Sequence, residues 1–289
     1  MSTMKGFVLC ADDFGLTAGI SHGILELLAD GRLSATGAMT NRPHWPVFAP
    51  ALRAFDGRAD LGVHLNLTCG APLTAMADFA PERRLPGLPR ILSQAMLRRL
   101  PEHEIAHELT AQLDAFELAM GRAPDFIDGH QHVHGLPGIQ PIFLSVIQRR
   151  YTVGHRPYVR VCGDRVWRIL RRGAFAAKAL NVRQLTRGLD RRLANLGFAT
   201  NDGFAGFSDF NPDGDYARAF ASYLAAPGAR HLVMCHPGFV DEELPTLDPV
   251  LHSRERELEF LASNVFADLC HAAGMAPVRM ARAGAALAG

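Results

Sequence analysis

The chain has 289 residues, of which 48% are hydrophobic, and a formal net charge of +1 at pH 7. This length suits one large α/β domain or at most two small ones, and the apolar share is enough to bury a sizeable core. The near-balance of charge gives no global field that would attract nucleic acid, and the five scattered cysteines form no CxxC pair, which favours a reducing, cytoplasmic location.

Predicted strands and helices alternate along the chain. A buried strand is expected over Phe7–Ala11 and an amphipathic helix over Ala18–Asp30. Further strands are expected over Ala35–Thr40, Leu61–Leu67, Asp125–Asp128, Tyr158–Cys162, Leu232–Cys235 and Ala276–Met280, and further helices over Pro101–Met120, Ile139–Arg150 and Ser253–Ala273. This alternation is typical of a parallel sheet with crossover helices, either open or closed into a barrel.

We expect one domain over residues 1–289, in which about 281–289 form a flexible Ala/Gly-rich tail. The Pro-rich loop over Cys69–Pro89 is long enough to cover a site. No stretch approaches the roughly 18 consecutive apolar residues that a membrane span requires.

Polar residues follow four of the predicted strands, each close to the point where the strand ends. Because the carboxyl ends of parallel strands gather at one edge of the fold, we expect these residues to meet there and form a site. The four groups are Asp12 with Asp13, His64, the histidines His130, His132 and His134 of the segment DGHQHVHG, and His236.

Each group alone has a simpler structural interpretation. The two aspartates could cap a helix or form a turn, and His64 could be a hydrogen-bonded core histidine. The histidine-rich segment could be a surface loop, and His236 could belong to a turn. Four groups at four strand ends are harder to explain by chance than any one of them, so we favour a functional site.

The residue types indicate which chemistry this site would perform. Carboxylate and imidazole ligands suit a borderline divalent cation. A catalytic site would use three protein ligands and keep a position for water, whose pKa the metal lowers while it polarises a carbonyl. A second carboxylate could take the water's proton, and a histidine across the site could protonate a leaving amine.

Several motifs occur together in one order along the chain. They are ADDFGLTAGISHGILELLADGRLSATGAMTN, GVHLNLTCGAPL, DFIDGHQHVHGLPGI and VMCHPGF, and they span roughly Phe7 to Val240. In this combination the chain resembles the YdjC-like carbohydrate deacetylases, a group that includes chitooligosaccharide deacetylases and hopanoid-biosynthesis-associated deacetylases.

The resemblance implies a fold, a reaction and site residues. The fold is a distorted TIM-like (β/α) barrel, and a homodimer is expected at the level of the family. The reaction is removal of the N-acetyl group from an acetylated amino sugar, on an oligosaccharide or a glycolipid, by attack of a metal-bound water. Matched by motif, the ligands of the metal (Mg²⁺ or Zn²⁺) are Asp13, His64 and His130, the base is Asp12, and the general acid or oxyanion partner is His236. We expect substrate contacts from His132, His134 and Arg160.

Spacing alone leaves two assignments open. The roles of Asp12 and Asp13 could be exchanged, and either His132 or His134 could replace His130 as the ligand. Two other functions also compete with the deacetylase. One is another metal-dependent amidohydrolase on a β/α barrel, and the other is a non-catalytic protein that binds a sugar or a metal.

The segment 165–192 carries nine basic residues and one acid, Asp190, interleaved with apolar residues at roughly helical spacing. The simpler interpretation, which we favour, is a solvated helix face whose apolar side packs on the barrel. The alternative is a peripheral membrane contact that would place the protein at the inner face of the membrane, since basic amphipathic helices bind anionic interfaces.

Overall fold

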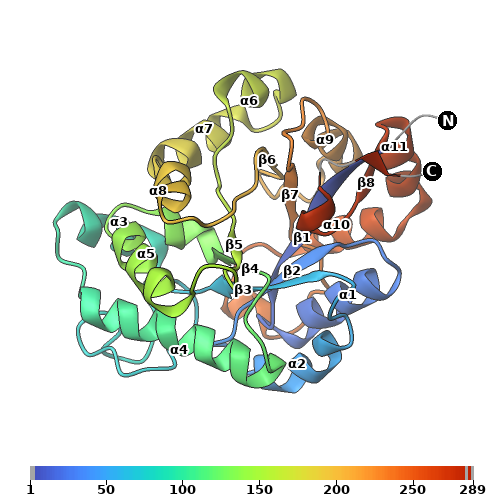
Figure 1. Cartoon of the computed structure of the whole chain (residues 1–289). Coiled ribbons are helices and arrows are strands. Elements are labelled where there is room, and N and C mark those ends of the chain that lie inside the picture. The colour runs from blue at the N-terminus through green and yellow to red at the C-terminus, as the bar shows by residue number, and fades with distance from the viewer. Residues whose placement is uncertain (1–3, 284–285, 288–289) are drawn as a thin grey trace.

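A computed structural model of the protein describes residues 4–283 and 286–287 and has a curled parallel sheet at its centre (Figure 1). Seven strands lie in the order β5-β4-β3-β2-β1-β7-β6, and each neighbouring pair is parallel. Their bounds are β1 (Met4–Phe14), β2 (Ala35–Ala38), β3 (Asp60–Leu65), β4 (Phe126–Gly129), β5 (Tyr158–Val159), β6 (Phe204–Ala205) and β7 (Leu232–Cys235).

The α/β barrel architecture predicted from the sequence is confirmed in an open form. The two end strands, β5 and β6, are only two residues long and do not pair with each other; β5 makes one isolated bridge, from Val159 to Thr200 in the segment before β6. The sheet therefore curls into a half-barrel instead of closing as a regular ring of eight strands. A further strand, β8 (Met275–Pro277), pairs with the first half of β1.

Helices surround the sheet, and two of them show how the sequence sets their ends. In α1 (Ala18–Ala29) the Thr17 side chain accepts the Ile20 N–H and caps the first turn. In α4 (Glu102–Met120) the helix stops at Gly121, whose φ of 72° is in the left-handed region that glycine tolerates. The others are α2 (Trp45–Arg53), α3 (Leu88–Met96), α5 (Ile139–Arg150), α6 (Val166–Arg172), α7 (Ala176–Leu185), α8 (Leu189–Asn195), α9 (Tyr216–Tyr223), α10 (His252–Ala262) and α11 (Asn264–Ala272).

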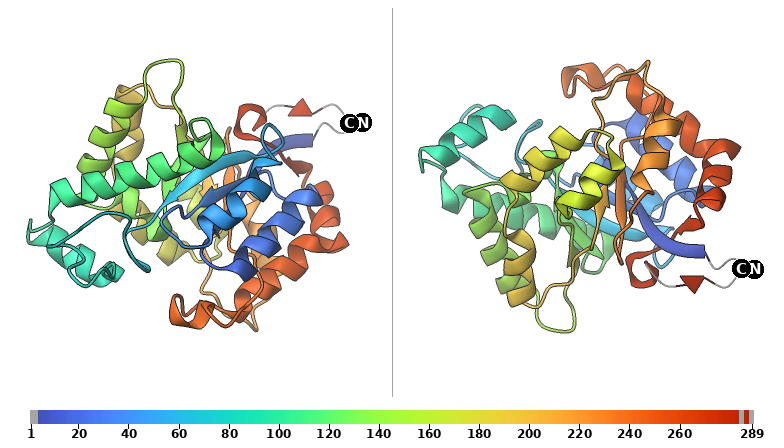
Figure 2. Two further views of the ribbon diagram at one scale, coloured as in Figure 1. Left: turned by 90° about the horizontal axis from the view of Figure 1, so that it is seen from below. Right: turned by 90° about the horizontal axis from the view of Figure 1, so that it is seen from above.

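The core lies on both faces of β1. Phe7 to Ala11 are fully buried, as expected for a central parallel strand that is covered by helices on both sides. Helices from the two ends of the chain cover one side together: α1 contacts α10, and Figure 2 shows them side by side. The strand therefore forms a rigid centre from which its last residues, Asp12 and Asp13, reach the site.

The structure corrects some predicted boundaries. The helix expected over Ser253–Ala273 is two helices, because Ser263 has an extended backbone and its hydroxyl caps α11 by accepting the Phe266 N–H. The loop over Cys69–Pro89 contains no helix until α3 begins at Leu88. Of the expected tail, residues 284–285 and 288–289 lie outside the described part of the chain, while Ala286–Leu287 pair with β1 as β9.

The basic segment 165–192 folds into α6, α7 and most of α8. Several of its arginine side chains contact other residues of the protein: Arg168 and Arg172 form ion pairs with Asp164, and Arg183 donates a hydrogen bond to the Asp164 carbonyl. On α6, however, Trp167 and Leu170 remain 55% and 59% exposed. Within residues 4–283, no helix combines the length and the hydropathy that crossing a bilayer requires.

Candidate active site

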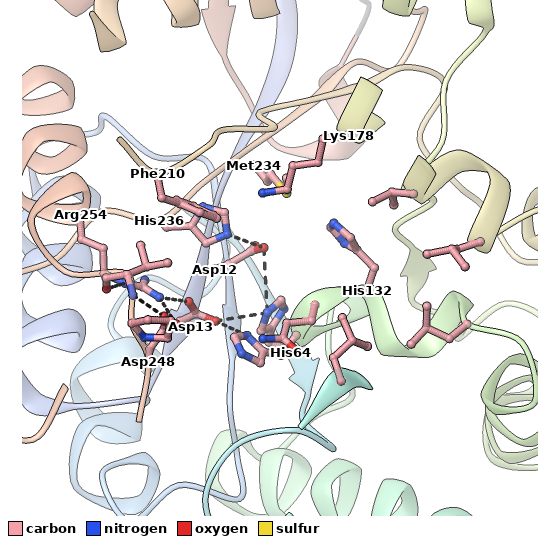
Figure 3. Close-up of a pocket in the computed structure, with 18 residues that line it drawn as sticks. Asp12, Asp13, His64, His132, Lys178, Phe210, Met234, His236, Asp248 and Arg254 are labelled. Atoms are coloured by element: carbon pink, nitrogen blue, oxygen red, sulfur yellow. Dashed lines mark hydrogen bonds and ion pairs between the residues drawn. The ribbon is translucent and has the colours of Figure 1, made fainter. Parts of the chain in front are cut away.

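A cavity of about 320 Å³ opens at the carboxyl ends of the strands (Figure 3). Six of the eight residues predicted for the site line it: Asp12, Asp13, His64, His130, His132 and His236. They come from β1, β3, the segment after β4 and the segment after β7. The expectation that polar groups after four strands meet at one edge of the sheet is therefore confirmed.

A distortion of β1 points two consecutive aspartates into the same cavity. In a regular strand, neighbouring side chains point to opposite faces. Here the register with β2 shifts between Ala11 and Phe14, and Asp13 has a φ of 71°, which is unusual for a residue other than glycine. The bulge turns Asp13 inward beside Asp12. Strained backbone of this kind is concentrated at functional sites.

Asp13 forms a cluster with two histidines. Its Oδ1 lies 2.9 Å from Nδ1 of His130 and 3.4 Å from Nε2 of His64. The three side chains are buried, and one potential ligand atom from each lies within 4.8 Å of those of the other two. Burial opposes ionisation of Asp13, but the charges of His130 and Arg254 outweigh it and hold the pKa of this carboxyl well below its usual range.

Two residues outside the predicted set, Asp128 and Arg254, hold this cluster in place. Asp128 Oδ1 lies 2.6 Å from Nδ1 of His64, so that Nδ1 is the donor and Nε2 faces Asp13. Arg254 Nη2 donates to Asp13 Oδ2 at 2.8 Å and also to Asp248. Carboxylates that orient a histidine in this way are the usual outer partners of metal-ligating imidazoles.

The electrostatics of His64 fit a bound cation. Burial would lower the pKa of this imidazole, but the carboxylates of Asp128 and Asp12 outweigh it and raise the pKa to about 10. The surroundings of Nε2 therefore favour positive charge. A second group of possible ligands, Cys10 with Asp12 and Asp128, is different, because the Arg160 guanidinium already neutralises its two carboxylates.

Asp12 is ionised and held by an arginine. Arg160 Nη1 and Nη2 donate to its two oxygens at 2.6 and 2.9 Å. Burial raises the pKa of Asp12, but Arg160 and His64 outweigh that effect and lower it to about 2. Figure 3 shows Asp12 between His64 and His236, whose Nε2 atoms lie 4.0 and 3.8 Å from Asp12 Oδ2.

His236 faces Asp12 from the end of β7. Its backbone N–H donates to Oε2 of Glu257 at 2.6 Å, and its ring meets Phe210 edge to face at 5.3 Å. Burial lowers the pKa of His236 to about 4 against the opposing effect of Asp12. The imidazole is therefore neutral at pH 7.

The histidine-rich segment divides its side chains between the cavity and the core. Gln131 and His132 have φ values of 51° and 60°, and both line the cavity. Burial holds the pKa of His132 well below its usual range. His134 points away, and its Nε2 donates to the Arg160 carbonyl at 2.8 Å.

The structure does not support direct substrate contacts by Arg160 and His134. Neither lines the cavity, Arg160 is fully buried, and its guanidinium is occupied by Asp12 and Asp128. The cavity also contains residues that sequence reasoning missed, among them Lys178, Phe210 and Arg254. Asp128 could have been found, since it opens the same DGHQHVH segment that supplied His130. Arg254 lies in a helix with no motif to mark it.

Comparisons with known proteins agree on the family. The family model described as YdjC-like protein matches residues 6–272. A chitooligosaccharide deacetylase of Klebsiella pneumoniae (strain 342) is 34% identical over 82% of this chain and 83% of its own length. Another, of Yersinia enterocolitica, is 32% identical over 90% of this chain and 91% of its own length.

A solved structure supports the fold. A protein of Enterococcus faecalis V583, named for cellobiose-phosphate cleavage, superposes with a TM-score of 0.74 at 20% identity, over 96% of this chain and 98% of its own. With the family model matched over nearly the whole length, the chain belongs to the YdjC-like family.

Proposed function

We propose that this protein is a metal-dependent hydrolase that removes the N-acetyl group from an acetylated amino sugar. The observation that carries the proposal is the buried cluster of Asp13, His64 and His130 with the ionised Asp12 beside it. The relatives named chitooligosaccharide deacetylase support the substrate class. The alternatives, another amidohydrolase or a non-catalytic binding protein, lack comparable support.

The proposed metal ligands are Asp13, His64 and His130. One carboxylate and two imidazoles are the donors that zinc-like cations prefer, whereas Mg²⁺ prefers oxygen ligands, so we favour Zn²⁺ or a similar transition metal over Mg²⁺. When bound, such a cation would polarise the acetamide carbonyl and lower the pKa of water. Asp128 would keep His64 in the orientation that presents Nε2.

Asp12 is the proposed base. Its low pKa keeps it ionised at pH 7, and Arg160 fixes both of its oxygens, so that the carboxylate is oriented before substrate arrives. As water attacks the acetamide carbon, Asp12 takes the water's proton. Arg160 thus acts as a positioning residue behind the base.

His236 is the proposed acid. The carbon–nitrogen bond breaks when the leaving nitrogen receives a proton, which yields acetate and a free amine. Because His236 is neutral at pH 7, it must first take up a proton, and Asp12 lies 3.8 Å from its Nε2. The alternative role of His236, a partner for the carbonyl oxygen, needs no such uptake.

The remaining walls of the cavity are mainly apolar and suit the acetyl methyl group and the faces of a sugar ring. They include Leu88, Leu136, Phe210 and Met234. His132 faces the same space and is our remaining proposed substrate contact from the histidine segment.

Acetate release tests the proposal. Purified protein, with and without EDTA, is incubated with N-acetylglucosamine oligomers and with a glycolipid that carries N-acetylglucosamine. We expect acetate from at least one substrate and none after EDTA, with activity restored by added Zn²⁺. Release of no acetate by protein shown to contain metal would contradict the deacetylase and favour a different amide substrate or a binding role.

The expected cytoplasmic location and homodimer stay predictions. The peripheral membrane contact was expected through residues 165–192. Within this segment we propose α6 as the membrane-binding surface, because its exposed Trp167 and Leu170 lie beside Arg165 and Arg171. Apolar side chains next to cations suit an anionic lipid surface.

A further inference from the structure

Helix α10 contacts the candidate active site at two points. Arg254 and Glu257 are three residues apart on this helix, so their side chains leave it on the same side. Arg254 donates to Asp13, a proposed metal ligand (Figure 3). Glu257 accepts from the backbone of His236, the proposed acid. One helix therefore contacts both a proposed metal ligand and the proposed acid.

The turn formed by His236, Pro237 and Gly238 is bonded to α10 through its backbone. The His236 N–H donates to Glu257 Oε2 at 2.6 Å, and the Gly238 N–H donates to the Arg254 carbonyl at 3.3 Å. Because Pro237 has no N–H, every backbone donor of the three residues bonds to this helix. The backbone position from which the imidazole projects is therefore set by α10.

The carboxyl group of Glu257 is buried in an unusual way. The residue is only 2% exposed, it does not line the cavity, and it forms no ion pair with any described residue. Burial raises the pKa of Glu257 to about 7, although its hydrogen bonds with the His236 N–H and the Tyr216 hydroxyl oppose that shift. A glutamate is rarely buried without a cationic partner, since packing alone favours an apolar side chain. These contacts indicate that the carboxyl group serves the turn.

The imidazole of His236 has few other polar contacts to fix it. Its Nδ1 is buried without a hydrogen-bond partner in the described part of the chain. Its Nε2 lies 3.8 Å from Asp12 Oδ2, which is longer than a direct hydrogen bond. The ring of Phe210 contacts it edge to face. The place of the imidazole in the cavity therefore depends on packing and on the backbone that Glu257 binds.

We propose that Glu257 is a positioning residue, which holds the backbone of His236 so that the imidazole meets the leaving nitrogen. The inference rests on the proposed function and adds a residue outside the cavity to the proposed reaction. Removal of this carboxyl group should displace the imidazole and leave the substrate-binding walls unchanged. A displacement of about 1 Å can lower the rate by about 100-fold.

A double-mutant cycle tests this inference through acetate release from an N-acetylglucosamine oligomer. Glu257→Met keeps the length of the side chain and removes both acceptor oxygens, whereas Glu257→Gln keeps one. For Glu257→Met we expect kcat about 10- to 100-fold lower and KM within about twofold of the wild type. Glu257→Gln should recover most of the loss, and Glu259→Met, which changes an exposed glutamate of the same helix, should match the wild type. In His236→Ala, adding Glu257→Met should not lower kcat again, because the imidazole that Glu257 positions is gone.

Amide hydrogen exchange provides a measurement that does not need turnover. By NMR, the His236 N–H should exchange at least about tenfold faster in Glu257→Met than in the wild type, while the amides of β1 keep their protection. Faster exchange in Glu257→Met, together with no acetate release by the wild type, would show that Glu257 holds His236 and would refute the proposed reaction.

Two kinetic outcomes would overturn the proposal: an unchanged kcat in Glu257→Met, or an equal loss of kcat from Glu257→Met with and without the His236 imidazole. If Glu257→Met does not fold, exchange is compared between the wild type and Glu257→Gln. The neutral amide oxygen is a weaker acceptor than a carboxylate, so the His236 N–H should exchange faster in Glu257→Gln. Equal exchange in the two proteins would overturn the proposal.

Discussion

Replacing Asp128 by Asn tests how the site holds its proposed metal. Asp128 is fully buried, its Oδ1 lies 2.6 Å from His64 Nδ1, and its Oδ2 lies 2.9 Å from Arg160 Nη1. The amide keeps nearly the same shape and one acceptor but removes the negative charge that supports His64. Loss of such an outer partner lowers metal affinity by about 10- to 100-fold. At about 1.4 kcal/mol per factor of ten, this is about 1.4–2.8 kcal/mol of binding free energy.

The assay is competition for Zn²⁺ between the protein and a chelator, with thermal unfolding of the metal-free protein recorded in parallel. The control is Asp114→Asn, which removes an exposed carboxylate that pairs with Arg150. We expect the control to bind Zn²⁺ as the wild type does. If Asp128→Asn also binds Zn²⁺ with unchanged affinity, the argument that Asp128 orients His64 as a ligand is refuted.

Three further predictions concern the same fold. Asp12→Asn should keep Zn²⁺ and lower kcat by about 10²- to 10⁴-fold, whereas His130→Ala should lose Zn²⁺; full metal occupancy in His130→Ala would refute the ligand assignment. Arg160→Met should lower the free energy of unfolding by about 3–5 kcal/mol in urea titrations, because two buried carboxylates lose their partner; unchanged stability would contradict the ion pairs described. The wild type should sediment with anionic vesicles at low salt and Trp167→Ser should do so less; absence of wild-type binding would remove the membrane contact.

The sequence was most informative where a periodic pattern and a strand end coincided. The spacing of apolar residues in α4 and α5 predicted those helices closely, because each buries an apolar face, whereas the apolar run before Asp12 located β1 but missed three residues at each of its ends. The break in the last helix was missed, since it depends on one backbone conformation at Ser263 that apolar periodicity does not register. The sheet stays open because β5 and β6, at its two ends, are very short, and no local sequence pattern indicates that shortness.

In the candidate site, too, some residues could be predicted from the sequence and others could not. The six cavity residues that were predicted all lie in the last three residues of a strand or within three residues after one, where topology alone brings them together. His134 and Arg160 were expected to contact substrate, but neither lines the cavity. The left-handed turn at Gln131 and His132 directs His134 toward the Arg160 carbonyl. The Arg160 guanidinium pairs with Asp12. Arg254 reaches Asp13 from 241 residues away, a contact that only the folded chain provides.

Titration of metal-stripped protein with Zn²⁺, followed by acetate release from an N-acetylglucosamine oligomer, tests the central claim most directly. With Asp13, His64 and His130 as the ligands of a catalytic ion, acetate release should be absent without metal and should rise to a plateau at one equivalent per chain. Full acetate release by protein without metal would contradict the account.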